Sequence, residues 1–124
     1  MDFELTEEQR DIKKAAKEFA EGEFDKEKAM EWEREHRFPW EIWRKACELG
    51  FVGIHFPEEF GGGGYGILEN ALVVEEFCRV DSGIGIALSL ADFSSEIILR
   101  RRSLTKHPGT SPLFMNLAAP EVRT

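Results

Sequence analysis

The clearest hydrophobic pattern near the start of the chain is that of an amphipathic helix over about residues 6–23. Apolar residues recur there every three or four positions, which places them on one face of a helix. They are Ile12, Ala15, Ala16, Phe19 and Ala20. Thr6 is suited to cap this helix, because Gln9 three residues later can complete a capping box. The opening segment therefore predicts a helix with one buried face.

Two further helices are predicted before residue 51. Residues 25–36 consist mainly of helix formers and offer little apolar surface, which predicts a short, exposed helix. Another begins at Pro39, since proline suits a first helical turn, and Gly50 is its expected C-terminal cap. Its apolar stripe consists of Trp40, Ile42, Trp43, Ala46, Cys47 and Leu49. Trp40 and Trp43 could also form a ligand box, although core packing is the simpler interpretation.

A glycine-rich loop over residues 50–66 interrupts the helices. The four consecutive glycines at 61–64 cannot sustain a regular helix or strand, because glycine loses the most backbone entropy on ordering. Gly61, Gly63 and Gly66 match the G-x-G-x-x-G spacing of a dinucleotide-binding loop, but no βαβ pattern surrounds them and no Lys follows. A structural turn between helices is the alternative.

After the loop, the pattern predicts a helix over about residues 67–80. The side expected to be buried consists of Leu68, Ala71, Leu72, Phe77 and Cys78. Glu75 and Glu76 lie near the centre of this helix, where paired carboxylates could perform acid–base chemistry. Adjacent residues on a helix point about 100° apart. We therefore expect the two side chains to lie on a solvated face.

The last helix, over about residues 83–100 with Asp81-Ser82 as its cap, is apolar around its whole circumference. Such a helix must be buried on all sides, and four flanking helices, two of them short, can hardly cover it. The sequence thus predicts an all-α fold, an up-and-down bundle of about five helices with an irregular C-terminal tail. It also predicts that another domain, another subunit or an apolar ligand covers the last helix.

Charge is distributed unevenly along the 124 residues, whose formal net charge is −8. Residues 1–99 hold 11 Lys and Arg against 23 Asp and Glu, whereas residues 100–124 hold 5 against 1. The acidic body disfavours nucleic acid as a partner, because phosphate contacts need clustered Lys and Arg. Residues 100–102, all Arg, could bind a small anion, although a surface run without function is the simpler interpretation.

No apolar run reaches the length of about 18 residues that suggests a membrane span, and the charged N-terminus does not resemble a secretory signal. Cys47 and Cys78 lack the spacing of a metal site or a redox pair, and we expect buried thiols. A soluble, cytoplasmic protein is expected.

Several short segments follow one another in a specific order. They are L-T-E-E-Q-R from Leu5, L-G-F-V-G-I-H-F-P-E-E-F-G-G-G-G from Leu49, a helix with a Glu-Glu pair, and R-V-D-S-G from Arg79. In this order they resemble the N-terminal domain of the acyl-CoA dehydrogenases. The resemblance covers about residues 3–100, and it divides the chain into a helical domain over 1–100 and a non-matching tail over 101–124.

The tail departs from the family abruptly. The sign of the charge reverses at the same point, and the tail contains helix-breaking prolines at 108, 112 and 120. We expect a truncated or frame-shifted reading frame, with a genuine short protein that has its own tail as the alternative.

The resemblance implies an FAD-dependent oxidoreductase that removes α and β hydrogens from an acyl-CoA thioester and passes electrons to an electron-transfer flavoprotein. In the family, FAD is held mainly by two later domains and the catalytic base is a glutamate of the C-terminal domain. The 124-residue chain alone is therefore expected to be inactive, and its uncovered last helix predicts a homo-oligomer. The alternative function is a small helical protein-interaction module without catalysis.

The family's last N-domain helices help to wall the acyl-chain pocket. The residues that match this stretch are Leu88, Ser89, Leu90, Asp92 and Phe93. Glutaryl-type relatives carry an Arg shortly after D-S-G that pairs with the distal carboxylate of the substrate. Ile84 or Gly85 occupies that place here, and Asp92 would repel an anion. We therefore expect an acyl chain with an uncharged end.

Overall fold

The structure, a computed structural model, describes residues 3–90. Within this range it is all α-helical, with a short 3₁₀ turn and no strand. The elements are α1 (Glu7–Glu23), α2 (Lys26–Arg34), α3 (Trp40–Glu48), η1 (Glu58–Phe60) and α4 (Ile67–Val80), followed by a helix at 82–90. The prediction of an all-α bundle of five helices is confirmed. The predicted tail and the continuation of the last helix lie outside the described residues.

The helix ends follow the local sequence closely. The predicted capping box is present, since the Gln9 N–H donates to Thr6 Oγ1 at 3.2 Å and the Thr6 N–H donates to Gln9 Oε1 at 3.0 Å. α2 is short and contains no buried residue, as predicted. Pro39 lies at the N-cap of α3, one position before the first helical turn in which we expected it.

Gly50 ends α3 with a left-handed backbone, at φ +81°. Its N–H donates to the carbonyl of Cys47 at 3.1 Å, and the N–H of Phe51 donates to the carbonyl of Ala46 at 2.9 Å. This pair of bonds is the Schellman motif, which favours glycine because a Cβ is strained at positive φ. The turn directs Phe51 back into the core, where it is 8% exposed.

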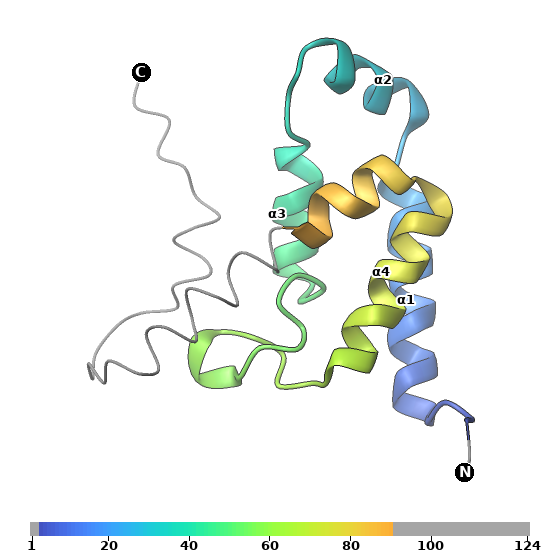
Figure 1. The fold of residues 1–124 in the computed structure, drawn as a ribbon, viewed down its shortest axis with the longest axis vertical. Helices are drawn as coiled ribbons and strands as arrows, with labels where there is room; N and C mark the ends of the chain where they lie inside the picture. Colours follow the sequence, from blue (N-terminus) through green and yellow to red (C-terminus); the bar gives the residue numbers. More distant parts are fainter. Residues whose placement is uncertain (1–2, 91–124) are drawn as a thin grey trace.

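The core lies between α1 and α4, which run side by side in the same direction (Figure 1). Four aromatic rings form its centre, contributed by Phe19, Phe24, Phe51 and Phe77. The ring centroid of Phe77 lies 5.6 Å from Phe19, 5.4 Å from Phe24 and 5.6 Å from Phe51. Phe77 thus connects α4 to α1, to the link after α1 and to the loop after α3.

The buried side of α4 differs from the predicted one. Leu68 is 51% exposed and Ala71 is also exposed, whereas Val73 and Glu76 are buried. The prediction was wrong for these residues because α1 contacts the next face around the helix, and α1 supplies Lys13 to that face as a partner for a carboxylate. Leu72 and Phe77 are buried as predicted.

Truncation of Phe77 should remove the ring that joins these segments. We expect Phe77→Ala to lower the free energy of unfolding by about 3–5 kcal/mol, the range for large-to-small substitutions of buried aromatics. Leu68→Ala on the exposed side of α4 should cost less than about 1 kcal/mol. Urea denaturation followed by circular dichroism measures both, and equal costs would contradict the assigned core.

Candidate functional site

The glycine-rich loop is closed by its own backbone hydrogen bonds. Each amide N–H from residue 61 to residue 65 donates to a carbonyl of the preceding segment. The acceptors, in order, are Glu58, Pro57, Gly53, Phe56 and Ile54. A phosphate-binding loop must instead direct such donors toward its ligand. The loop geometry therefore favours a structural turn.

Two of these glycines are required by close packing. A Cβ on Gly62 would overlap the carbonyl of Phe56, and a Cβ on Gly63 would lie 2.8 Å from the carbonyl oxygen of Ile54. The neighbouring Glu58 and Glu59 also carry negative charge. These residues do not fit the pyrophosphate of a dinucleotide such as FAD, and we derive no step through a cofactor at this loop.

Helix 82–90 has one face in the core and one face open. Asp81 caps it as predicted, because its Oδ1 accepts the N–H of Ile84 at 2.9 Å. Ile84 and Leu88 are 5% and 2% exposed, whereas Ile86 and Leu90 are 51% and 62% exposed. We expected this helix to be covered on all sides. The described residues cover only the side of the helix that carries Ile84 and Leu88.

The predicted wall residues are divided between these faces. Leu88 is packed in the core, Leu90 is on the open face, and Asp92 and Phe93 lie outside the described residues. Ser89 is half-buried, and its hydroxyl donates to the carbonyl of Gly85 at 2.6 Å, so its proton is used within the helix. We define the open face as Ile86, Ser89 and Leu90.

Ile86 was not among the wall residues predicted from the sequence. Its spacing of three and four residues from Ser89 and Leu90 would have placed it beside them on a helix. The two positions considered for a carboxylate-binding Arg, Ile84 and Gly85, are both buried. An Arg at either position would therefore begin on the core side of the helix.

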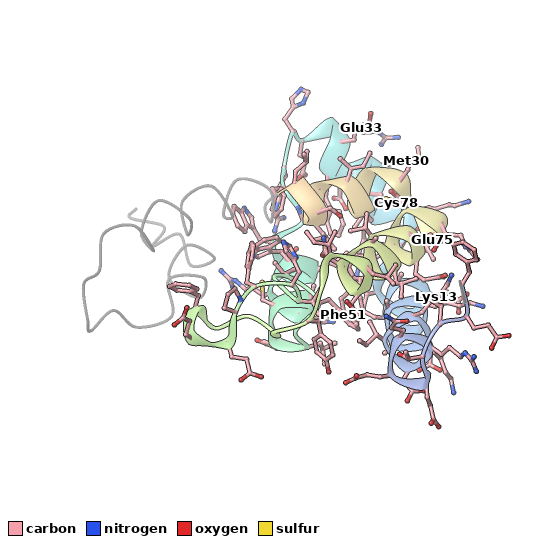
Figure 2. The ribbon with its side chains drawn as sticks, turned by 60° about the horizontal axis from the view of Figure 1, so that its bottom comes forward. Lys13, Met30, Glu33, Phe51, Glu75 and Cys78 are labelled. Atoms are coloured by element: carbon pink, nitrogen blue, oxygen red, sulfur yellow. The ribbon has the colours of Figure 1, made fainter. Side chains whose placement is uncertain are left out.

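Glu75 and Glu76 lie at the contact of α4 with α1. Glu75 is exposed as predicted, with Oε2 3.2 Å from Lys13 Nζ, and the two residues occupy facing sides of the helices (Figure 2). The hydrogen bond from Lys13 lowers the pKa of Glu75 below its usual range. Glu76 was wrongly expected on a solvated face. It is 1% exposed, because its Oε1 lies 3.5 Å from Lys13 Nζ and 3.8 Å from Arg79 Nη1.

A cleft of about 580 Å³ lies between α2 and the start of helix 82–90. Its apolar lining includes Met30, Trp32, Phe38, Ile84 and Ala87. None of the residues of the open face lines this cleft, so it is a separate surface.

The remaining sequence candidates have structural roles or lie outside the described range. Trp43 is 5% exposed in the core, as predicted, whereas Trp40 is 36% exposed and contacts Phe38, with ring centroids 4.6 Å apart and the ring planes tilted by 57°. Cys47 and Cys78 are half-buried and are not joined in a disulfide. The arginines at 100–102 are outside the described residues. In residues 3–90, no helix is both long enough and apolar enough to cross a membrane.

Lys13 should be needed to keep Glu76 buried. Lys13→Met leaves the Glu76 carboxylate with Arg79 alone, and we expect the free energy of unfolding to fall by about 1–3 kcal/mol. Lys17→Met removes only an exposed pair with Glu21 and should cost less than about 1 kcal/mol. Adding Glu76→Met to Lys13→Met should recover stability, since it removes a buried charge that has kept only the longer pair with Arg79. Equal losses in the two single variants would contradict this role.

Glu69 should contribute to the acid sensitivity of the fold. Its carboxylate accepts hydrogen bonds from Gln9 Nε2 at 2.8 Å and from the Gly66 N–H at 2.9 Å, and the bond from Gln9 is the main reason that its pKa is lowered from 4.5. A lowered folded-state pKa gives stability that is present above the unfolded pKa and is lost as pH falls through the folded pKa.

The stability of the unmodified chain should therefore fall more steeply below pH 4.5 than that of Glu69→Gln. Denaturation midpoints measured between neutral and acidic pH test this prediction. Parallel pH profiles for the two proteins would refute it.

Comparison with known proteins identifies this arrangement of helices. A family model described as the N-terminal domain of acyl-CoA dehydrogenase matches residues 6–101. The chain is 51% identical over 77 residues to an acryloyl-CoA reductase (NADH) of Anaerotignum propionicum, covering 62% of this chain and 19% of that relative. It is 40% identical over 89 residues to a short-chain specific acyl-CoA dehydrogenase of Clostridium acetobutylicum, covering 72% of this chain and 23% of that relative.

A solved structure gives the same result. A chain from work on the electron transferring flavoprotein of Acidaminococcus fermentans superposes with a TM-score of 0.61 at 46% identity, over 71% of this chain and 23% of that chain. The present chain thus spans about a fifth of the length of the relatives it matches. Since the family match extends from α1 through helix 82–90, the chain belongs to the acyl-CoA dehydrogenase family through that family's N-terminal domain.

Proposed function

We propose that the chain serves as the N-terminal helical domain of an FAD-dependent acyl-CoA dehydrogenase, which oxidises the Cα–Cβ bond of an acyl-CoA thioester. The observation that carries this proposal is the open face of helix 82–90 in a domain of this family. Ile86 and Leu90 are exposed on this face, next to or within the stretch that the resemblance assigns to the acyl-chain wall. The chain would supply one wall of the pocket.

The open face has the chemistry that a hydrocarbon chain requires. Two aliphatic side chains are exposed there, and burial of apolar surface against an acyl chain is favourable by about 25 cal/mol per Å². Ser89 uses its hydroxyl proton on the Gly85 carbonyl, so the wall offers no charged or free donor group from its described residues. Leu88 would support the wall from the core side.

The proposed wall extends beyond the described residues. Asp92 and Phe93, which the resemblance also assigns to the wall, lie outside the described residues. We propose that Asp92 adds a negative charge beside the acyl chain. Relatives are named for acryloyl, isobutyryl and isovaleryl groups, none of which carries a charge. This supports a substrate whose acyl end is uncharged.

The cofactor and the base are assigned to parts outside this domain. The glycine loop does not fit a flavin pyrophosphate, and the family's catalytic glutamate belongs to its C-terminal domain. The neighbour from work on an electron transferring flavoprotein supports a protein of that kind as the electron acceptor. We further propose that the complete protein is a cytoplasmic homo-oligomer.

An acyl-CoA dehydrogenase assay with an artificial electron acceptor tests the function. The complete enzyme that carries this domain should be yellow and active, whereas the isolated 124-residue chain should be colourless and inactive. The coding sequence downstream of Arg100, read in all three frames, should resemble the family's later domains. A clean stop and no activity in any longer product would favour the interaction module instead.

The acyl preference gives a sharper prediction. The complete enzyme should favour a neutral acyl-CoA over glutaryl-CoA of similar length by at least about 5-fold in kcat/KM, because a buried carboxylate without a partner costs about 1–3 kcal/mol or more. Ile86→Arg places a cation on the open face and should lower the ratio of kcat/KM for the neutral acyl-CoA to kcat/KM for glutaryl-CoA. A wild-type preference for glutaryl-CoA would contradict the proposed wall.

A further inference from the structure

Helix 82–90 and α4 approach each other backbone to backbone at Gly85. A Cβ placed on Gly85 would lie 2.7 Å from Sγ, 2.8 Å from the backbone N and 2.9 Å from Cα of Cys78. The optimal separation of carbon atoms is about 3.5–4.0 Å, and the backbone atoms of Cys78 cannot rotate away as a side chain can. The contact therefore requires glycine at position 85.

This contact lies behind the open face. Gly85 is buried, whereas its neighbour Ile86 is 51% exposed, because successive residues point about 100° apart on a helix. A single residue, Asp81, joins α4 to helix 82–90 and also caps it. Figure 2 labels Cys78 on α4, near the turn into helix 82–90. With the start of the helix fixed, the Gly85–Cys78 contact sets how far Ile86 and Leu90 project from the domain.

We infer that Gly85 and Cys78 form a spacer that positions the acyl-facing wall and thereby limits the length of the acyl chain accepted. This inference rests on the proposed function. Neither residue touches substrate in this account, so both are positioning residues. Movement of the wall by about the width of a methylene group should change the ratio of kcat/KM values between long and short acyl chains, since one methylene in an apolar pocket changes selectivity by about 10-fold or more.

Two substitutions move the wall in opposite directions. Gly85→Ala introduces the overlapping Cβ and should push helix 82–90 away from α4, which narrows the pocket. Cys78→Ala removes Sγ and should let the helix settle closer, which widens the pocket. Each has a matched control in this chain. Gly83→Ala lies on the same helix, where a Cβ would meet only Asp81 Oδ1 at 3.3 Å, and Cys47→Ala changes the other cysteine.

The first measurement is kcat/KM for a series of straight-chain acyl-CoA substrates with the complete enzyme. For Gly85→Ala, we expect the ratio of the longest to a short substrate to fall by about 10-fold. For Cys78→Ala, we expect this ratio to rise, and both controls should leave it unchanged. A ratio that stays constant in Cys78→Ala, or that moves equally in test and control variants, would overturn the inference. If Gly85→Ala does not fold, the substrate ratio measured for Cys78→Ala alone tests the inference.

The second measurement does not depend on activity. In the 124-residue chain, the rate of thiol alkylation at Cys78 relative to Cys47 reports how closely the helix covers Sγ. Gly85→Ala should raise this relative rate and Gly83→Ala should not. Unchanged labelling would overturn the spacer itself. Raised labelling in the chain, combined with a complete protein that oxidises no acyl-CoA, would instead show that the proposed function is wrong and that the chain-length inference falls with it.

Discussion

The pairing of α1 with α4 is the contact on which the rest of the domain depends. Its apolar part is centred on Phe77, which contacts Phe19 and two further rings. Its polar part lies beside it, where Lys13 faces the buried carboxylate of the adjacent Glu76. Aromatic packing supplies the larger part of the stabilisation. We interpret the polar contact as the element that fixes register, because sliding α1 along α4 would separate the buried Glu76 carboxylate from Lys13 and leave it with Arg79 alone.

Each later feature follows from the position of α4. The glycine loop leads into the first residue of α4. Hydrogen bonds from the loop's amides to the carbonyls of Ile54 and Phe56 fix the position of the loop. One residue, Asp81, then turns the chain into helix 82–90. Because this link is so short, the second helix must cross α4 closely, and Gly85 makes that approach possible. The exposure of the open face therefore follows from how α4 and the residues before it pack.

The sequence predicted best what is decided locally. The Thr6 capping box, the glycine turn after α3 and the bounds of α4 depend on residues within a few positions of one another. The resemblance to the acyl-CoA dehydrogenase family also came from the sequence, because it rests on the order of short segments. The family model agrees with it over residues 6–101.

What the sequence could not predict is rotation of helices against their partners. In α4, Leu68 and Leu72 looked equivalent, but only the position of α1 decides that Leu72 is buried and Leu68 is not. The burial of Glu76 likewise depends on Lys13, which is 63 positions away in the sequence. The last helix, predicted over about residues 83–100, is apolar around its circumference, so its pattern contains no information about which side packs. The roles of Leu88 and Ile86 emerged only from the structure.

The central claim is that Ile86 and Leu90 form a surface built to be covered. Binding of a hydrophobic dye to the 124-residue chain, measured together with size-exclusion chromatography at high concentration, tests it most directly, since large exposed apolar patches mark interaction sites. We predict dye binding and association for the unmodified chain, and a clear loss of both in Ile86→Ser/Leu90→Ser at unchanged helical circular dichroism. A strictly monomeric chain that binds no dye, or equal dye binding by the two proteins, would contradict the claim.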